Sequence, residues 1–230
     1  MSETALIVGT GSGLSASLAR LFAKEGMRVA LAARNPGKIA ALAQETGARS
    51  YGCDASRRED VAALIAGVTR DLGVPDIVVY NPSYRTRGPL VELDPAEVEK
   101  ALMVTCYGGF LVGQAAAKPM LERGSGSILF TGASASVKGY ALSAPFAMGK
   151  FGLRGLAQSM ARELAPKNIH VAHFVIDGGI RQQNDPRGNA RGADGLLEPD
   201  AIAETYLHIH RQHRSAWTWE VELRPWVETF

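Results

Sequence analysis

The stretch that decides the fold is ALIVGTGSGLSASLARLFAKEGMRVALAAR, residues 5–34. Its opening ALIV is apolar and includes β-branched side chains, which favours a strand. A run of glycines follows, and a segment with helical spacing then closes on Gly26, a residue type typical of a helix end. A second apolar run, RVALAA, occupies residues 28–33. Strand, glycine turn, helix and strand in this order predict a βαβ unit with parallel strands.

The same alternation continues along the rest of the chain. Further strand-like runs are DIVVY at 76–80, SILFT at 127–131, HVAHFVI at 170–176 and WTWEVELRP at 217–225. Helical spacing is found at 58–73, 151–168 and 198–212, and the second of these segments closes on Asn168. Near-continuous apolar strands are typical of parallel sheets that are covered on both faces. The length of 230 residues fits one domain, so we expect residues 1–230 to form a single-domain, doubly wound parallel α/β sheet of the Rossmann type.

Charge and hydropathy give no support for nucleic acid or a membrane as a partner. The 25 Lys and Arg residues nearly balance the 23 Asp and Glu residues, and a net charge of +2 gives no sign of a nucleic-acid or membrane-surface binder. The longest uncharged run, residues 101–117, contains several glycines and is shorter than the roughly 20 apolar residues of a membrane span. We therefore expect this run to be a buried helix.

The cysteines, the first residues and the histidines bear on location and on metal binding. Neither Cys53 nor Cys106 lies in a spacing typical of metal ligands or of a disulfide scaffold. The start, MSETALIVG, lacks the basic and apolar segments of a signal peptide, so we expect a cytoplasmic protein. The histidines of YLHIHRQHR, at 206–214, are unevenly spaced without acidic companions. This pattern favours a surface helix over a metal site, and no bound metal is expected.

One segment differs in composition from the rest of the chain. RQQNDPRGNARGADG, residues 181–195, is polar and rich in glycine, which predicts a mobile loop within the single domain. It is either a lid around residues 181–197 that covers a ligand at the sheet edge, or a plain connection. Its arginines, Arg181, Arg187 and Arg191, suggest an anionic group on the substrate or are simply solvated.

The glycine turn predicts a binding site for a dinucleotide. Backbone amides at a helix N-terminus point toward a bound anion, and glycine allows a pyrophosphate to approach without a Cβ atom in the way. A merely tight turn between strand and helix is the alternative. The residues expected to cradle the pyrophosphate are Gly9, Gly11, Ser12, Gly13 and Leu14.

The end of the second strand favours NADP(H) over NAD(H). NAD-binding domains usually place Asp or Glu there, about 20 residues beyond the glycines, to bind the ribose hydroxyls. Here the sequence reads AAR at 32–34, so no carboxylate is present and Arg34 offers a fork of donors for a 2′-phosphate. Arg34 could instead be an ordinary solvated arginine, but the missing acid argues against NAD(H) in either case.

The segment FAMGKFGLRGLAQSMARELAPKNIHVAHFVIDGGI, at 146–180, adds a recognisable pattern around Lys150. With it the chain resembles the short-chain dehydrogenase/reductase superfamily over nearly its whole length. The resemblance implies that the family's cofactor motif corresponds to Val8, Gly9, Gly13 and Ser15, with Val and Ser replacing the usual Thr and Gly. It also implies cofactor contacts from Asp54 and Ala55 after the third strand, Asn81 after the fourth, Lys150, and Gly178 with Ile180 after the sixth.

The residues that correspond to the family's catalytic set are largely replaced. The resemblance implies a Tyr four residues before Lys150, but Phe146 occupies that position and has no ionisable proton. The Ser position is Ala133, although Ser134 adjoins it, and the Asn position is Thr105. Lys150 is retained and is implied to bind the nicotinamide ribose. Tyr140 is the first candidate for a replacement acid, ahead of Tyr107 and Tyr84, which could equally be structural tyrosines.

The resemblance implies an NADP(H)-dependent oxidoreductase that acts on a small organic carbonyl, alcohol or enone with an atypical proton relay. A non-catalytic NADP(H)-binding sensor or partner protein is the alternative, motivated by Phe146, Ala133 and Thr105 together. A different nucleotide, such as FAD or S-adenosylmethionine, on the same glycine turn is a third. Relatives of this kind pair through the helices that correspond to 101–117 and 151–164, which implies a homodimer or homotetramer.

Overall fold

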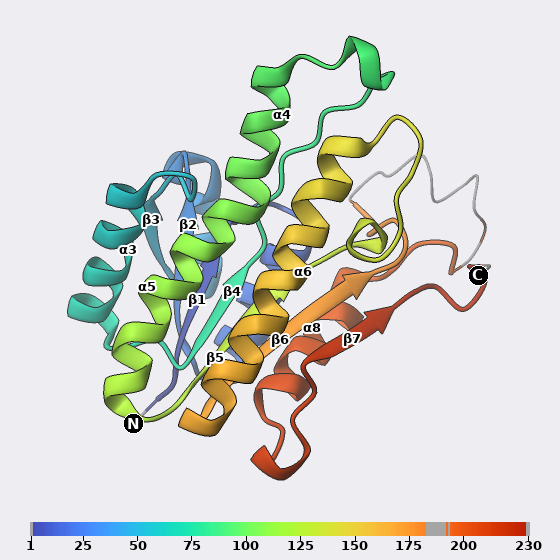
Figure 1. Cartoon of the computed structure of the whole chain (residues 1–230). Helices are drawn as coiled ribbons and strands as arrows, with labels where there is room; N and C mark the ends of the chain where they lie inside the picture. Colours follow the sequence, from blue (N-terminus) through green and yellow to red (C-terminus); the bar gives the residue numbers. More distant parts are fainter. Residues whose placement is uncertain (1, 183–191, 193, 229–230) are drawn as a thin grey trace.

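Parallel strands form one seven-stranded sheet in the protein, whose computed structural model describes residues 2–182, 192 and 194–228. The strands are β1 (Thr4–Val8), β2 (Arg28–Ala33), β3 (Arg49–Gly52), β4 (Ile77–Tyr80), β5 (Gly126–Thr131), β6 (Ile169–Ile176) and β7 (Glu220–Leu223). Their order across the sheet is β3-β2-β1-β4-β5-β6-β7, and each neighbouring pair is parallel (Figure 1). The predicted doubly wound parallel sheet is confirmed.

The chain reverses its direction of travel across the sheet at β1 and β4. Val8, at the end of β1, pairs with Ala32 on one side and with Tyr80 on the other. The amide of Asn81 then donates to the Val8 carbonyl, so Gly9 and Asn81 leave the sheet as neighbours. Ligands of open α/β sheets bind beyond the carboxyl ends of the strands at such a point. The strand register therefore places the glycine turn and the segment after β4 at one site.

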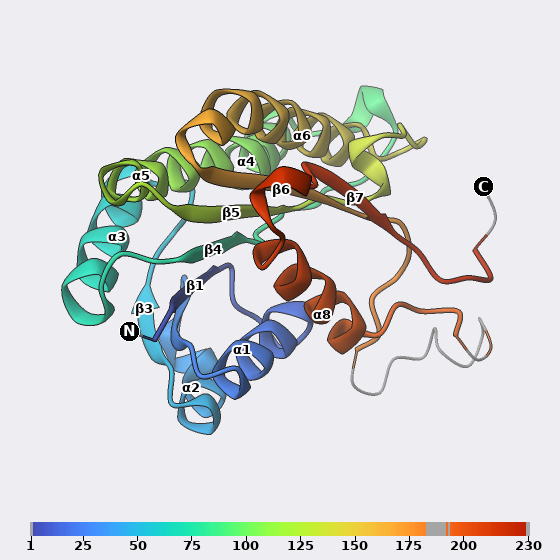
Figure 2. The same ribbon diagram turned by 90° about the horizontal axis from the view of Figure 1, so that it is seen from below.

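Helices cover both faces of the sheet, as Figure 2 shows from below. One face carries α1 (Leu14–Lys24), α2 (Ala40–Thr46) and α8 (Pro199–His210), and the other carries α3 (Arg58–Leu72), α4 (Pro95–Leu102), α5 (Gly108–Arg123) and α6 (Ala144–Leu164). None of the helices in the described part of the chain is long and apolar enough to cross a membrane.

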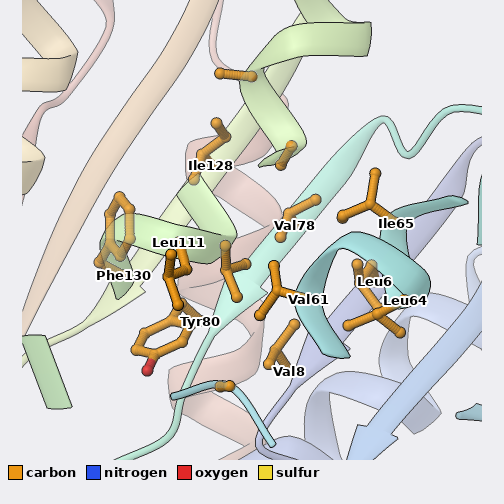
Figure 3. Packing of buried hydrophobic residues seen from close by; sticks show 14 of the residues in the cluster. Leu6, Val8, Val61, Leu64, Ile65, Val78, Tyr80, Leu111, Ile128 and Phe130 are labelled. Atoms are coloured by element: carbon orange, nitrogen blue, oxygen red, sulfur yellow. The ribbon is translucent and has the colours of Figure 1, made fainter. Parts of the chain in front are cut away.

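The core consists of two buried clusters, one on each face of the sheet. Leu6 and Val8 of β1 belong to the cluster under α3 and α5, while Ile7 between them belongs to the cluster under α1 and α8. Figure 3 shows the first cluster, where Val61 of α3 and Leu111 of α5 lie over the strands. Each such side chain contributes about 1.5–3 kcal/mol when it is fully buried, so both faces of the sheet stabilise the fold.

Helix α6 begins earlier than the helical spacing at 151–168 predicts. It starts at Ala144, with Pro145 in its first turn, and the chain closes through a short 3₁₀ turn on Asn168 in the left-handed conformation (φ 63°). Proline is accommodated in the first helical turn because its missing N–H has no partner there anyway. The earlier start has a consequence for the site, because it places Phe146 and Lys150 on one helix, one turn apart.

The uncharged run at 101–117 is helical, but the prediction that it is buried is wrong for part of its length. It comprises the end of α4, a π-helical turn over Met103–Tyr107 and the first half of α5. Tyr107 and Phe110 stack on each other and are 42% and 39% exposed. The run is buried only where it packs on the rest of the protein, as at Thr105 against Gly149 of α6, because a helix on an outer layer turns its other side away.

The histidine segment at 206–214 is more buried than the expected surface helix. His210, at the end of α8, has a side chain that is only 8% exposed, and its Nδ1 lies 2.9 Å from Ser127 Oγ. The helical spacing of 198–212 left open which side of α8 would pack on the sheet. Groups of three or more possible metal ligands are absent from the described residues.

Most of the predicted lid around 181–197 lies outside the described residues, including Arg187 and Arg191. At its described ends, the amide of Arg181 donates to the Leu197 carbonyl and the amide of Leu197 donates to Gly179. The Arg181 side chain forms an ion pair with Glu198. These bonds hold the two ends of the segment together beside the end of β6.

Candidate cofactor and substrate site

The glycine turn after β1 begins with a residue that has to be glycine. Gly9 has φ of 81°, and a Cβ atom there would lie 2.6 Å from Pro82 Cγ. The amides of Gly9 and Thr10 both donate to the Ala32 carbonyl at the end of β2. The turn is thereby fixed against β2 on one side and against the segment after β4 on the other.

The other two glycines of the turn leave open space in front of helix α1. A Cβ atom at Gly11 or Gly13 would meet no atom within 4 Å, and no side chain caps the helix at Gly13. Ser12 between them is exposed, whereas Leu14, the first helical residue, is buried. A helix N-terminus without a cap favours an anionic ligand, because its first amides lack helical partners. The turn can therefore accept a phosphate group that approaches the backbone closely.

A cavity of about 300 Å³ opens beside this turn, at the carboxyl ends of β1, β2, β3 and β4. It brings together predicted cofactor residues from separate parts of the chain: Gly9, Arg34, Asp54, Ala55 and Asn81. Residues that the sequence reasoning did not assign to the cofactor also line it: Thr10, Cys53, Pro82, Ser83, Val104 and Tyr84, the last of which the sequence suggested only as a replacement acid. Most of these additional residues are next to predicted ones in the sequence. Their position close to a strand end could therefore have indicated that they line the cavity.

Charged side chains lie at one end of this cavity. Arg34 is exposed and forms no ion pair among the described residues. Asp54 accepts hydrogen bonds from the amide and the hydroxyl of Ser56. Burial alone would raise the pKa of Asp54, but these hydrogen bonds and the charge of Arg34 bring the pKa below its usual value. The carboxylate is thus ionised at neutral pH, and the Arg34 guanidinium acts on it without forming an ion pair with it.

Asn81 connects the segment after β4 to the glycine turn. Its Nδ2 donates to Ser15 Oγ across 2.7 Å, and Ser15 Oγ donates to the Gly9 carbonyl across 3.1 Å. The Ser at position 15, where the family motif usually has glycine, therefore has a structural use. The side chain of Asn81 holds β4, the turn and α1 in register and also lines the cavity.

Lys150 of α6 is almost completely buried, with 3% of its surface exposed. Its Nζ donates to the Thr131 carbonyl at the end of β5, across 2.6 Å. Burial, followed by the positive charge of Arg85, lowers the pKa of Lys150 to about 7. No carboxylate contributes to this shift. The lysine is therefore poised to hold or lose a proton near neutral pH.

Phe146 lies one turn before Lys150 and is covered by an arginine. The Cζ atom of Arg85 lies 3.9 Å from the centre of the Phe146 ring, and Lys150 Nζ lies 5.8 Å from it. Arg85 belongs to the segment that follows Asn81, and the sequence reasoning did not single it out. Two cations thus meet at the ring that replaces the expected tyrosine.

Thr105 is buried within the π-helical turn, where it fixes the segment that carries Arg85. Its Oγ1 accepts a hydrogen bond from the amide of Tyr84 across 3.1 Å. The hydroxyl of Tyr84 donates to Glu97 of α4, and Lys100 lies over its ring, 4.3 Å from the ring centre. Tyr84 is therefore engaged in structural contacts. Thr105 acts on the site through the backbone it holds.

The remaining candidates lie farther from these contacts or make none with them. Ser134 begins a 3₁₀ turn and is half-buried, and its hydroxyl makes no hydrogen bond within the described residues. Tyr140 is 48% exposed on the loop before α6. Gly178 packs against Pro225, where a Cβ atom would lie 2.7 Å from Cδ, and Ile180 bridges to Leu197. None of these four residues lines the cavity beside the glycine turn.

A hydrogen-bonded array that the sequence reasoning missed lies beneath Lys150. His173 Nε2 lies 3.2 Å from Ser136 Oγ, and His173 Nδ1 lies 3.1 Å from Glu220 Oε2. Arg154 of α6 binds both oxygens of Glu220. Burial lowers the pKa of His173 to about 4, so the imidazole is neutral in the folded protein. The array links α6, β6 and β7, with His173 and Ser136 buried and the Glu220 and Arg154 side chains partly exposed.

The comparison with known sequences decides which family carries this arrangement. The sequence model described as short chain dehydrogenase matches residues 3–183. The chain belongs to the short chain dehydrogenase family. This confirms the resemblance and the expected class of oxidoreductases.

Relatives in the short chain dehydrogenase family match nearly the whole chain. A crystal structure of a short-chain dehydrogenase from Rhodopseudomonas palustris is 36% identical, with a TM-score of 0.85, and the match covers 97% of this chain and 99% of that one. A metagenomic short-chain oxidoreductase in complex with NADP is 28% identical, with a TM-score of 0.84 and 98% of each chain covered. Sorbitol-6-phosphate 2-dehydrogenase of Escherichia coli is 30% identical over 216 residues, covering 90% of this chain and 83% of the relative.

Proposed function

We propose that this chain is an NADP(H)-dependent oxidoreductase that acts on a small organic carbonyl, alcohol or enone with an atypical proton relay. The observation that carries the proposal is the cavity of about 300 Å³ that joins Gly9, Arg34, Asp54 and Asn81 at the carboxyl edge of the sheet. The open glycine turn lies at its border. Membership of the short chain dehydrogenase family and the NADP complex of a relative support the same reading.

In this proposal the ends of the cofactor are held by different parts of the site. Gly11, Ser12, Gly13 and Leu14 take the pyrophosphate, and Asp54 with Ala55 takes the adenine end. Arg34 binds the 2′-phosphate, since its guanidinium has no carboxylate partner among the described residues, which makes NAD(H) the weaker ligand. Gly178 and Ile180, at the end of β6, lie toward the nicotinamide end.

The bound cofactor supplies or accepts a hydride, and the protein has to manage the proton. Phe146 has no ionisable proton, so the position of the usual catalytic tyrosine holds no acid. Lys150 Nζ, with its pKa lowered to about 7, can hold or release a proton in the range where general acid catalysis is efficient. In this proposal the hydroxyls of Ser134 and Tyr140, on the segment between β5 and α6, relay it, and Thr105 fixes the backbone of Tyr84. The relay thus depends on Lys150 more than on a tyrosine.

Two measurements test this function. Fluorescence titration should show NADPH binding to the full chain, and NADPH oxidation should appear with at least one member of a panel of aldehydes, ketones and enones. If NADPH does not bind, the proposed function is wrong. Binding without oxidation of NADPH across the panel would favour the alternative, a non-catalytic NADP(H)-binding sensor or partner protein.

We further propose a homodimer or homotetramer formed through α5 and α6. Gly152 of α6 lies against Cys106 of the π-helical turn that leads into α5, and exposed aromatic and apolar side chains occur on the same elements: Tyr107, Phe110, Met148 and Phe151. Apolar side chains gathered on two neighbouring helices are typical of an interface between subunits. A monomeric mass by light scattering at micromolar concentration would overturn this assignment.

We assign the protein to the cytoplasm on the state of its cysteines. Cys53 and Cys106 are both free thiols, and burial raises the pKa of each above the ordinary value. Thiols of this kind persist in a reducing compartment. The substrate is a small molecule in this proposal, with neither nucleic acid nor membrane as a partner.

A further inference from the structure

Arg85 lies over the ring of Phe146, the residue that occupies the position of the family's catalytic tyrosine. Phe146 lies one helical turn from Lys150. The guanidinium packs on the aromatic ring, and no carboxylate takes part in this contact. Across the described residues Arg85 forms neither an ion pair nor a hydrogen bond. An arginine in contact with a ring and with no anionic partner of its own can offer its N–H donors to a ligand.

The charge around Arg85 is positive and is not balanced locally. Arg87 lies on the same segment, and together with burial it lowers the pKa of Arg85. The positive charge of Arg85 acts in turn on Lys150, and no acidic side chain contributes to the pKa of either residue. Like charges brought together without acids destabilise one another, so the arrangement favours an anion that enters from outside.

Arg85 is not needed to hold the segment in which it lies. That segment is already fixed by the bond from the Tyr84 amide to Thr105 and by the bond from the Gly88 amide to the Leu142 carbonyl. The hydroxyl of Tyr84 adds a third anchor on Glu97. A structural role for the Arg85 guanidinium is therefore unnecessary, and its position over Phe146 calls for another explanation.

We propose that Arg85, seated on the ring of Phe146, binds an anionic group of the substrate, so that the substrate is a carbonyl compound or alcohol bearing a carboxylate or a phosphate. This inference rests on the proposed oxidoreductase function, because it deepens the substrate class of that same site. Arginine binds both oxyanions through paired N–H donors. The flat ring of Phe146 supports the guanidinium from one side.

The first experiment measures anion binding without any need for turnover. Oxalate, inorganic phosphate and the neutral analogue oxamide are titrated calorimetrically into the full chain, with and without saturating NADPH. We expect oxalate or phosphate to bind and oxamide to bind at least tenfold more weakly. Arg85→Ala should weaken the anion at least tenfold, which corresponds to about 1.4 kcal/mol. Arg85→Lys should restore only part of this loss, because an ammonium lacks the fork of donors.

A matched variant separates specific binding of the anion by Arg85 from general attraction of the anion by positive charge. Arg87→Ala removes the same charge from the same segment, and it should change anion binding less than threefold. NADPH affinity should be the same in Arg85→Ala as in the natural protein. The preferred anion of the pair, oxalate or phosphate, identifies the oxyanion that the site takes.

The second experiment follows NADPH oxidation with pairs of 2-oxo acids and their methyl esters, and with phosphorylated and unphosphorylated hydroxyketones. We expect kcat/KM to favour the anionic member of a pair at least tenfold, and this preference should disappear in Arg85→Ala. The inference is overturned if the natural protein binds neither anion, if Arg85→Ala binds them equally well, or if Arg85→Ala loses NADPH binding to the same degree. Anion binding through Arg85 without any NADPH oxidation would instead reject the proposed function and leave the anion site standing.

Discussion

Lys150 Nζ donates to the carbonyl oxygen of Thr131 across 2.6 Å, and this is the hydrogen bond that holds the ammonium in the folded chain. The lysine is almost completely buried, and its pKa falls to about 7. Transfer of a charge out of water is unfavourable, and one backbone carbonyl offsets only part of that penalty. At neutral pH, Lys150 therefore destabilises the fold that contains it.

Lys150→Met should stabilise the cofactor-free protein by about 1–3 kcal/mol at pH 6.5. Methionine keeps an unbranched side chain of similar length without the charge. An unfolded lysine keeps its proton up to about pH 10.4, whereas Lys150 loses it near pH 7 in the folded chain. The gain in stability is therefore full below pH 7, and it disappears as the pH rises toward the pKa of the unfolded lysine. Urea unfolding at pH 6.5, 8 and 9.5 measures it, and a gain that does not shrink would point to packing instead of charge.

Arg34→Ala should weaken NADPH at least tenfold, about 1.4 kcal/mol, and leave NADH nearly unchanged. The reason is that only NADPH has the 2′-phosphate that an arginine at the end of β2 can bind, and no acid follows that strand to bind the ribose hydroxyls of NADH. Fluorescence titration of both cofactors measures the difference. Equal affinities of the natural protein for NADPH and NADH would remove Arg34 from the phosphate role.

Gly13→Val should abolish binding of either cofactor while the protein stays folded. A Cβ atom at Gly13 meets nothing within 4 Å, so the fold has room for the side chain, but a branched side chain intrudes where the pyrophosphate meets the helix. Thermal unfolding and NADPH titration of the same sample separate the two effects. Gly9→Ala is the contrasting variant, because a Cβ atom there would lie 2.6 Å from Pro82 Cγ and the fold itself should suffer. Intact NADPH binding in folded Gly13→Val would show that the nucleotide lies elsewhere.

Phe146→Tyr should raise carbonyl reduction roughly tenfold, since general acids contribute typically 10²–10⁴-fold and the usual Ser and Asn are still missing. The new phenol would lie on a ring that already has Arg85 over its face and Lys150 nearby. Both cations favour the phenolate and should lower the phenol pKa from about 10. Steady-state NADPH oxidation measures the change.

Tyr140→Phe in the natural protein is the control for this variant. Loss of activity in Tyr140→Phe together with no gain in Phe146→Tyr would identify Tyr140 as the replacement acid. If neither variant alters any rate while NADPH still binds, the non-catalytic alternative is preferred.

The protein should lose about 2 kcal/mol of stability between pH 8 and pH 5 through His173 alone. The unfolded imidazole takes up its proton near pH 6.5, whereas burial delays protonation to about pH 4 in the folded protein. Because the unfolded chain binds more protons in this interval, acid favours unfolding. Denaturant unfolding of the natural protein and of His173→Gln across this range measures the contribution, and an identical pH dependence in both would contradict it.

The sequence predicted every strand of the sheet except β3. β3 (Arg49–Gly52) is short, polar and largely exposed at the edge of the sheet, so no apolar run marks it. Only the resemblance to a known family implied a third strand before Asp54. Gly9 and Arg34 could be assigned from the residues alone, because each directly follows a recognisable strand and parallel strands end at one edge, whereas only the resemblance implied Asn81.

Contacts between distant residues could not be predicted in this way. Nothing in the pattern around Arg85 indicates that it will lie over Phe146, since the contact depends on where the segment after β4 passes over α6. His173 likewise occupies a strand whose neighbours are apolar, and its partners Ser136 and Glu220 come from two other elements. Pairings of this kind are set by tertiary packing, which one sequence without relatives does not specify.

The cavity beside the glycine turn has walls drawn from five stretches of the first half of the chain, from Val8 to Val104. A molecule that fills it is therefore a further noncovalent cross-link between segments that the sheet and the hydrogen bonds of Asn81 and Ser15 already unite. Present at a hundredfold excess over its dissociation constant, it would add about 2.7 kcal/mol to the free energy of unfolding. Amide hydrogen exchange should then slow together at the ends of β1, β2, β3 and β4, so that the occupied cavity makes these strand ends a single cooperative unit.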